Sequence, residues 1–486
     1  MKAWMNKALE LLAESLDPPR HELNELDWKT NLSPDKKRLA EHLSAFSNYS
    51  GGGFLVFGIN AAGKPVGIEE QEVHNTIGQL ANLGRSSVEP PIALDHAIGA
   101  YDSVSLLFVY IQESVVKPVH IRGKPMDEAF IRSGGTTRRA SHQEIGTMML
   151  RSRTPRWEEL RASMLKSDEE LIQMLNTGSI LRLAGIKPPS SDTELIDWLS
   201  AEKFIFKEPA GGGYVTNLGA IAAARKLSDF PDDLSRKAVR VIVYDGLNKA
   251  KTKQEREGKR GYATSFQNLL LFVMSLLPQS EVIERALRVR LTVYPEVALR
   301  ELIANALIHQ DFAIGGSGPL IEIFDDRIEI SNPGGLLPSK RLDRLIGTQP
   351  ESRNEQLARS FRRYKICEER GSGLVKAGNE VELYGLPPMD FHAGSNYFKV
   401  TLHSPRTFGQ MSPRERSEAC YQHAVLKHLS GNAMTNTSLR ERLKMPERQR
   451  AMVSAVIKIA LDTGRIKPVD PLNKSLKFAR YVPFWA

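Results

Sequence analysis

The sequence of 486 residues contains only two cysteines, Cys367 and Cys420, which lie far apart and show no Cys-x-x-Cys spacing. A disulfide framework or a structural zinc site needs more cysteines, or cysteines and histidines at characteristic spacings. We therefore expect neither. This sparing use of cysteine fits a protein of the reducing cytoplasm.

Long hydrophobic runs are also missing. The longest largely apolar run, residues 269–277, is too short to cross a bilayer and predicts a buried helix. The N-terminus lacks the successive charged, apolar and cleavage regions of a secretion signal, so we expect a cytoplasmic protein without a membrane partner. No Gly-x-x-x-x-Gly-Lys-Ser/Thr sequence occurs, which argues against a P-loop helicase engine.

An excess of acidic residues is absent as well. The formal net charge is +9, and the hydrophobic and charged fractions, 41% and 25%, are those of an ordinary globular protein. Residues 411–486 hold fourteen Lys and Arg but only six Asp and Glu, so nearly all of the positive excess lies there. A basic terminal domain suggests a polyanionic partner, DNA or RNA.

The pattern of apolar residues predicts several domains of α/β and α+β class. A strand is expected at Leu26–Lys29, a helix at Lys36–Asn48 and a buried strand at residues 54–59. Residues 320–331 predict a β-hairpin whose two-residue turn is Asp325-Asp326. Residues 248–261, which are polar and lysine-rich, predict a solvated loop. We place domains at residues 1–150, 151–232, 233–405 and 411–486, of which the second is a linker with a small winged-helix-like segment.

One predicted helix carries three polar residues at helical spacing. Glu301, Asn305 and His309 are separated by four residues each, so their side chains project from about the same face. Taken alone, a Glu-x-x-x-Asn pair is usually a solvated helix edge. The sequence that follows favours a binding site instead.

Two glycine-rich turns and a strand follow this helix. Asn332-Pro-Gly-Gly-Leu-Leu-Pro338 comes first, then Glu-Arg-Gly-Ser-Gly at 369–373, then an alternating strand at 397–402. This order, over residues 237–402, resembles the GHKL (Bergerat) ATPase family. The resemblance implies an α/β sandwich that binds ATP and Mg²⁺.

The resemblance also implies a role for each residue of these motifs. Asn305 would bind Mg²⁺ through its amide oxygen, and Glu301 would orient a water for attack on the γ-phosphate. Asn332 stands where the family usually has the aspartate that accepts a hydrogen bond from the adenine amino group, and an amide can accept it too. The complete set of predicted nucleotide-binding residues is Asn305, His309, Asn332, Gly334, Gly335, Arg370, Gly371, Ser372 and Gly373.

Four arginines lie between the two glycine turns, where a lid would sit. They would either meet phosphates or solvate a helix, and the sequence leaves both alternatives open. They are Arg353, Arg359, Arg362 and Arg363.

The N-terminal region contains a second set of motifs. Glu22-Leu-Asn-Glu-Leu-Asp27-Trp-Lys29 is followed by Ala-Phe-Ser-Asn at 45–48, by three glycines at 51–53 and by Phe-Gly-Ile-Asn at 57–60. Over residues 20–140 this resembles the Schlafen family's AlbA-type domain, which implies an α/β fold and includes tRNA- and DNA-directed nucleases as well as nucleic-acid-binding regulators.

In the nuclease members of that family, acidic residues hold a divalent metal ion. Glu22 and Asp27 fall on the first two acidic positions and would be metal ligands and catalytic residues, with Lys29 beside them. The position of the third acid is taken by Ala61. The ligand set is therefore incomplete, which favours nucleic-acid binding over cleavage.

Helices predicted at 417–429, 437–443 and 447–462, followed by a hairpin over 465–483, indicate a C-terminal winged helix-turn-helix. Such a domain binds DNA, or it docks proteins or dimerises; the local charge favours DNA. The predicted nucleic-acid contacts are Arg448, Arg450, Lys458, Lys474, Lys477 and Arg480.

Three functions remain open. The domain order resembles a bacterial group of transcriptional regulators loosely called RecG-like helicases, so the first is an ATP-binding, and ATP-hydrolysing, regulator whose nucleotide state controls DNA or RNA engagement. The second is an ATP-gated metal-dependent nuclease, for example in phage defence. The third is a non-catalytic assembly protein with structural ATP. We also expect a homo-oligomer.

Overall fold

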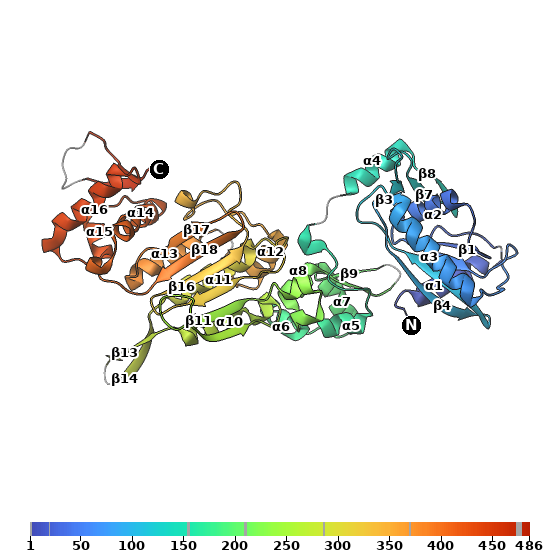
Figure 1. Cartoon of the computed structure of the whole chain (residues 1–486), viewed down its shortest axis with the longest axis horizontal. Helices are drawn as coiled ribbons and strands as arrows, with labels where there is room; N and C mark the ends of the chain where they lie inside the picture. Colours follow the sequence, from blue (N-terminus) through green and yellow to red (C-terminus); the bar gives the residue numbers. More distant parts are fainter. Residues whose placement is uncertain are drawn as a thin grey trace. The chain divides into compact units, whose positions relative to one another are not determined.

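The computed structural model describes residues 2–18, 20–152, 156–208, 211–284, 287–368, 371–472 and 479–486. The predicted site residues Arg370, Lys474 and Lys477 lie outside these ranges. The chain forms two compact units, Met1–Ile172 with Ser190–Thr216, and Gln173–Pro189 with Asn217–Ala486 (Figure 1).

The first unit is built on a four-stranded mixed sheet in the order β1-β2-β5-β4. The strands are β1 (Leu26–Lys29), β2 (Gly53–Phe57), β4 (Leu94–Tyr101) and β5 (Val104–Ile111). The parallel pair β1–β2 is extended by antiparallel β5 and β4. β2 is buried over its whole length, as expected of a strand covered on both faces.

Alternate residues of β2 enter two different cores. Phe54 and Val56 pack with α1 (Met5–Leu16), whereas Leu55 and Phe57 pack with α2 (Lys36–Asn48) and α3 (Glu70–Ser86). The side-chain period of two along a strand gives this separation. The first unit therefore contains a three-layer α/β arrangement, with helices on both faces of the sheet.

Shorter elements complete the first unit. The hairpin β7–β8 packs against α2, and Ser141 forms a capping box with Glu144 at the start of α4. The remaining elements are β3 (Val88–Glu89), β6 (His120–Ile121), β7 (Phe130–Ser133), β8 (Thr136–Arg139), α4 (His142–Arg151), η1 (Trp157–Glu159), α5 (Asp168–Met174, which crosses the unit boundary), α7 (Asp192–Ala201), β9 (Ile205–Lys207) and β10 (Gly213–Val215).

The second unit contains a six-stranded sheet in the order β12-β11-β15-β16-β18-β17. Its strands are β11 (Arg240–Tyr244), β12 (Thr252–Glu257), β15 (Leu320–Ile323), β16 (Arg327–Pro333), β17 (Asp390–Ala393) and β18 (Tyr397–His403). The predicted hairpin is confirmed as β15 and β16, which pair antiparallel from Ile323 and Ile328 outward.

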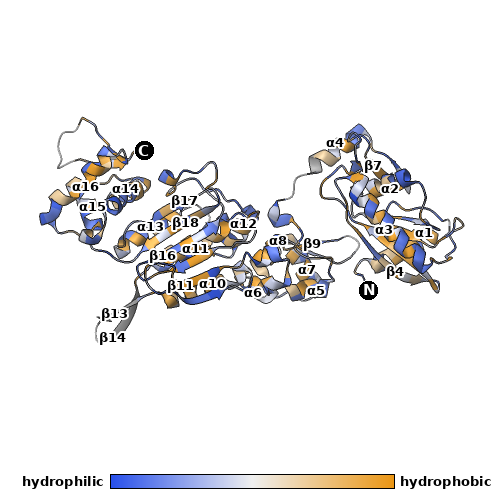
Figure 2. Ribbon diagram, viewed as in Figure 1, coloured by the Kyte–Doolittle hydropathy of each residue, from blue (hydrophilic) through white to orange (hydrophobic). Residues whose placement is uncertain are grey.

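Helices pack on this sheet and carry the site. Figure 1 shows α11 (Glu296–His309) along β16, and α11 also contacts α10 (Tyr262–Leu276) and α13 (Gly373–Tyr384). α10 carries many hydrophobic residues (Figure 2), but Leu271 is 55% exposed, so the predicted buried helix is buried on one face only. The other elements are α6 (Thr177–Ala184), α8 (Asn217–Ala223), η2 (Leu227–Asp229), α9 (Asp232–Ser235), the hairpin β13 (Gln279–Glu284) and β14 (Leu287–Thr292), η3 (Leu342–Arg344) and α12 (Glu355–Arg363).

The prediction of a solvated loop at residues 248–261 is wrong in one respect, because Thr252–Glu257 form the edge strand β12 paired with β11. All six of its residues are exposed. A charged edge strand shows no hydrophobic alternation, since only its backbone is engaged with the sheet. The solvent exposure that the sequence indicates is nevertheless present.

The chain ends in three helices and a short antiparallel hairpin. These are α14 (Pro413–Leu429), α15 (Asn436–Arg442), α16 (Arg450–Asp462), β19 (Ile466–Pro468) and β20 (Tyr481–Pro483), with η4 (Phe408–Gln410) before α14 and η5 (Glu447–Gln449) before α16. Thr435 caps α15, as its hydroxyl accepts from the backbone N–H of Ser438 at 3.1 Å. In the described residues, no helix has the length and apolarity needed to span a membrane.

Candidate functional site

The three polar residues of α11 line one cavity of about 170 Å³. α11 begins after Pro295 and ends at His309. Glu301, Asn305 and His309 face the cavity together with residues of both glycine turns and of the segment between them. The side of α11 that the sequence singles out is therefore a cavity wall, and the alternative of a solvated helix edge does not hold.

Glu301 lies against the start of α13. Its side chain is only 4% exposed, and a Cβ atom placed on Gly373, the first residue of α13, would lie 2.5 Å from its Oε2. A side chain at this position would require the Glu301 carboxylate to move. Burial raises the pKa of Glu301 above its ordinary value, while the nearby Arg300 opposes the shift.

The first glycine turn brings Asn332 to the cavity. Asn332 is buried on β16, and its Nδ2 donates to the carbonyl oxygen of Pro333 at 2.9 Å. This bond leaves Oδ1 as the side-chain atom that can accept a hydrogen bond from a ligand. Gly334 adopts φ +96°, and a Cβ there would lie 2.7 Å from Cβ of Asp311.

Among the described residues, the predicted site residues divide into those that line the cavity and those that do not. Gly334 packs against Asp311, and the Ser372 hydroxyl donates to Glu368 at 2.9 Å; neither residue lines the cavity. The residues that line it are Glu301, Asn305, His309, Asn332, Gly335, Gly371 and Gly373.

One basic side chain of the cavity wall was missed by sequence reasoning. Lys340 is 10% exposed; its ammonium group lies 3.4 Å from the hydroxyl of Thr348 and 3.7 Å from a carboxylate oxygen of Glu351. Burial and the charges of Arg353 and Lys340 lower the pKa of His309 to about 4, so His309 is neutral at physiological pH. Lys340 is a cation of the cavity wall that no local motif marks.

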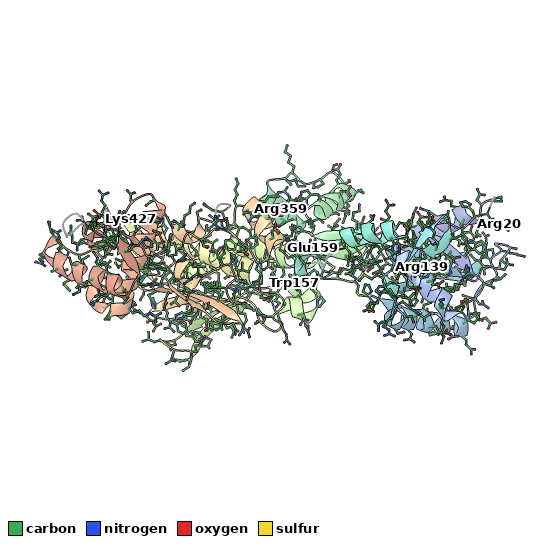
Figure 3. All side chains as sticks on the ribbon, turned by 90° about the horizontal axis from the view of Figure 1, so that it is seen from above. Arg20, Arg139, Trp157, Glu159, Arg359 and Lys427 are labelled. Atoms are coloured by element: carbon green, nitrogen blue, oxygen red, sulfur yellow. The ribbon has the colours of Figure 1, made fainter. Side chains whose placement is uncertain are left out.

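The four arginines of the segment between the glycine turns have different roles. Arg353 donates to the carbonyl oxygens of His309 and Gly335 and pairs with Asp311, so it fastens α11 to the first glycine turn. Arg362 lines the cavity. Arg359, labelled in Figure 3, and Arg363 are exposed on α12.

The two predicted acidic residues of the first unit, Glu22 and Asp27, lie near each other. Asp27 on β1 is fully buried; its Oδ1 accepts from Lys29 at 2.8 Å, and its Oδ2 has no hydrogen-bond partner among the described residues. Glu22 is near the surface, and burial together with the charge of Asp27 raises its pKa. Two carboxylates and a lysine are therefore brought together, as the motif predicts.

Basic groups surround this cluster. Nδ1 of His42 lies 3.8 Å from Oδ2 of Asp27 and 2.9 Å from the Thr137 hydroxyl, and burial lowers the pKa of His42 to about 4. Arg132 is 4% exposed, lies over the ring of Phe46 and interacts with the charges of Asp27 and Glu22. Sequence reasoning did not mark His42 or Arg132.

The acidic cluster does not complete a metal site. In the ranges that the structure describes, no three or more His, Cys, Asp or Glu residues are grouped so that they could hold a metal ion. Asn60 uses its Oδ1 to accept from the backbone N–H groups of Ala62 and Lys64. The position of the third acid is thus a local turn around Ala61, and the residues present do not fit a three-carboxylate centre.

The four predicted nucleic-acid contacts that lie in the described residues are accessible. Arg448, Arg450 and Lys458 are exposed around the start and along the length of α16, and Arg480 is exposed before β20. Their exposure makes them available to a polyanion.

Two regions of the chain match known families. Residues 22–141 match the family model "Schlafen, AlbA_2", and residues 316–402 match the model "Putative ATP-dependent DNA helicase recG C-terminal" of the HATPase_c_4 family. The chain thus contains a Schlafen AlbA_2 region and an ATPase-like region. The comparison with curated proteins gave no match.

Two solved structures align with this chain, one over nearly its whole length and the other over less than a third of it. The DIP2311 protein from Corynebacterium diphtheriae aligns over 99% of this chain and 96% of its own, with 15% identity and a TM-score of 0.42. The N-terminal domain of a RecG-related protein from Nitrosomonas europaea aligns over 29% of this chain and 95% of its own, with 23% identity and a TM-score of 0.21.

Proposed function

We propose that this protein binds ATP with Mg²⁺ in the cavity of its second unit, and that nucleotide occupancy controls how the chain engages DNA or RNA. The observation that carries the proposal is the meeting of the Glu301–Asn305 helix face, Asn332 and the glycine-started helix α13 around one cavity. The ATPase-like family match, which includes Asn332 and Gly373, supports it independently.

Each wall of the cavity has a chemical task in this proposal. Oδ1 of Asn332 accepts a hydrogen bond from the amino group of adenine. The amide oxygen of Asn305 suits the oxygen shell that Mg²⁺ prefers. Backbone N–H groups at the start of α13, with the adjacent Gly371, and the ammonium group of Lys340 suit phosphate oxygens. When bound, Mg²⁺ would neutralise phosphate charge.

Glu301 is placed to act on a water molecule. A buried carboxylate whose pKa is raised is a better proton acceptor than an exposed one. In this role Glu301 orients the water and takes its proton. The GHKL fold assignment, the four-domain division and the homo-oligomer belong to the same proposal.

Nucleic-acid binding is assigned to the C-terminal helices in this proposal, with α16 as the recognition helix of a winged helix-turn-helix. Its support is the positive excess of residues 411–486 and the exposure of Arg448, Arg450 and Lys458. Binding through such residues should weaken as salt concentration rises.

Calorimetric titration of the full chain with ATP and Mg²⁺ tests the nucleotide site. We expect saturable binding that Asn305→Ala reduces at least tenfold, and wild-type binding by Asn379→Ala, which removes an exposed amide from α13. Equal binding by both variants would refute the assignment of Asn305.

Phosphate release separates an ATPase from a protein with structural ATP. Wild-type protein should release phosphate slowly and Glu301→Ala should release none, while both still bind ATP. A duplex-DNA titration at several salt concentrations, with and without ATP, then tests the coupling; an affinity indifferent to nucleotide contradicts it.

A metal-dependent nuclease is the second candidate, and the unpartnered Oδ2 of buried Asp27 is the observation that favours it. Incubation with tRNA and with DNA, plus Mg²⁺ or Mn²⁺, provides the test. Cleavage that is lost in both Asp27→Asn and Glu22→Gln would support it, and intact substrates would exclude it under those conditions.

A further inference from the structure

The segment between the glycine turns has an inner and an outer side. We define residues 340–353 as the lid segment. Its inner side lines the cavity through Lys340, Leu345 and the run 348–353. Its outer side, at Asp343, Arg344 and Gly347, meets the C-terminal helices.

Three contacts fasten this outer side. The hydroxyl of Tyr421 on α14 donates to the carbonyl oxygen of Asp343. The Arg344 guanidinium lies over the ring of Phe484, 5.1 Å from its centroid. A Cβ on Gly347, which has φ +79°, would lie 2.4 Å from a methyl carbon of Leu429, so the two residues are in close contact.

Tyr421 is itself held in place from several directions. Arg465 lies over its ring at 4.0 Å, Phe484 stacks on it at 6.3 Å, and Nε1 of Trp485 donates to its hydroxyl at 3.1 Å. The last residues of the chain therefore bear on the same hydroxyl that holds the lid segment.

Helix α13 gives a second link between the cavity and the C-terminal helices. It begins at the cavity with Gly373, and its twelve residues span roughly 18 Å. Near its other end, Glu382 lies 2.9 Å from Nδ1 of His423 and 3.2 Å from Nε of Arg442. The C-terminal helices thus hold both the lid segment and α13.

We infer that Tyr421 and Leu429 are positioning residues for the nucleotide, because they hold the lid segment in the place where it forms the cavity wall. This inference rests on the proposed ATP site and adds the part of the chain that regulates it. A loop ordered before binding loses less conformational entropy when the ligand arrives. Linkage requires the reverse effect too: nucleotide binding must stabilise the packing of the C-terminal helices on the lid segment.

Tyr421→Phe tests this contact, although it also removes the hydrogen bond from Nε1 of Trp485. It removes the hydroxyl and keeps the ring contacts with Arg465 and Phe484. Since a net hydrogen bond is worth about 0.5–1.5 kcal/mol, the Kd for ATP should rise roughly twofold to tenfold. Leu429→Ala, at a residue 39% exposed, should raise the Kd in the same direction. Tyr101→Phe, in the first unit, is the matched control and should bind as wild type.

The fluorescence of Trp485 should respond to nucleotide only if Tyr421 and Leu429 act on the lid segment, and not if they merely stabilise the fold. Trp485 is the one tryptophan among residues 217–486, and its contribution to emission is obtained by difference from Trp485→Phe. We expect its emission to change on titration with ATP and Mg²⁺, with the midpoint of the calorimetric curve. The change should shrink in Leu429→Ala, which keeps the hydrogen bond between Trp485 and Tyr421, while the melting temperature stays near that of wild type.

The outcomes are distinguishable. If wild-type protein gives no binding heat with ATP, both the proposed function and this inference fail. If ATP binds but Trp485 emission does not change, or both variants bind with wild-type affinity, this inference alone is overturned. A raised Kd with altered Trp485 emission supports it.

Discussion

Two buried carboxylates, one in each unit, have opposite surroundings. Asp27 lies in a cluster where Lys29 contacts it at 2.8 Å and Arg132 adds positive charge. Glu301 lines a cavity, and among the described residues no lysine, arginine or histidine lies within ion-pair distance of it. The first carboxylate is paired with a cation of its own unit, whereas the second has no ion-pair partner among the described residues.

In the proposed function, Asp27 is a carboxylate that stabilises the fold, whereas Glu301 is a carboxylate that acts on a ligand. A buried charge with cationic partners is part of what keeps a fold together, and removing a partner is strongly destabilising. A buried carboxylate beside a cavity has lost hydration without gaining a cationic partner, so its pKa stays raised. Such a carboxylate can interact with a ligand that enters the cavity. Sequence motifs mark the two residues equally, and only their surroundings distinguish them.

The largest expected effect comes from breaking the compensated cluster. Arg132→Ala removes the donor to the carbonyl oxygens of Leu23, Asn24 and Gly135 and leaves the charge of Asp27 less compensated. We expect a loss of about 3–5 kcal/mol in the free energy of unfolding of the first unit.

Urea denaturation followed by tryptophan fluorescence measures this loss, because four of the five tryptophans lie in the first unit. Arg138→Ala, which breaks the exposed pair with Glu144, is the matched control and should change little. A similar effect of the two substitutions would remove the contrast between a buried and a surface cation.

The next effect concerns the open carboxylate. Gly373→Ala places a methyl group where only 2.5 Å is available beside Oε2 of Glu301. The methyl group displaces either the Glu301 carboxylate or the start of α13, whose N–H groups are assigned to the phosphates, so ATP affinity should fall by about a factor of five, which corresponds to about 1 kcal/mol. Calorimetry measures it, and Gly315→Ala, where the added Cβ meets nothing within 4 Å, should bind as wild type.

A smaller effect tests the desolvation of Glu301 through pH. Because its pKa is raised in the folded protein, the folded state keeps the proton over a pH range in which the unfolded state has lost it. The contribution of Glu301 to stability therefore falls as pH rises through this range, which begins near 4.5, its ordinary pKa.

Glu301→Gln should accordingly raise the Tm at pH 7.5 by roughly 2–4 °C, the shift that about 1 kcal/mol produces in a unit of this size. The gain should vanish at pH 4. Thermal melting across pH 4–8 measures it, and a lower Tm of the variant at pH 7.5 would show that Glu301 is compensated after all.

The smallest expected effect is on base choice. An amide offers both a donor and an acceptor, whereas a carboxylate only accepts. Asn332→Asp should therefore improve the preference for ATP over GTP a few-fold, because the introduced carboxylate would accept from the adenine amino group and repel the guanine O6 atom. Competition between the two nucleotides measures it. An unchanged ratio would mean that Asn332 does not contact the base.

Much of the fold could be predicted from sequence wherever burial is periodic. The strand Leu26–Lys29, the helix Lys36–Asn48 and the hairpin of β15 and β16 are confirmed because alternating or helically spaced apolar residues determine them. β12 was missed as a strand because only its backbone is engaged, and a charged edge strand has the composition of a loop.

The site shows the same limit. Glu301, Asn305 and His309 could be assigned to one wall because helical spacing fixes their common face. Lys340 could not be assigned from sequence, because only the path of the lid segment in the folded chain places it on the cavity wall. Arg132 could not either, since its acceptor Asn24 is 108 residues away in sequence. Proximity created by folding leaves no local signature.

The exposed edge of β12 also has a consequence for how copies of the protein meet. A sheet edge offers unpaired backbone groups to any other strand, and charged side chains are a common means of discouraging such pairing. Lys253, Glu255, Arg256 and Glu257 are all exposed along this edge. Replacing two of them with valine should therefore favour strand-to-strand assembly or aggregation. These charges discourage the formation of a continuous intermolecular sheet.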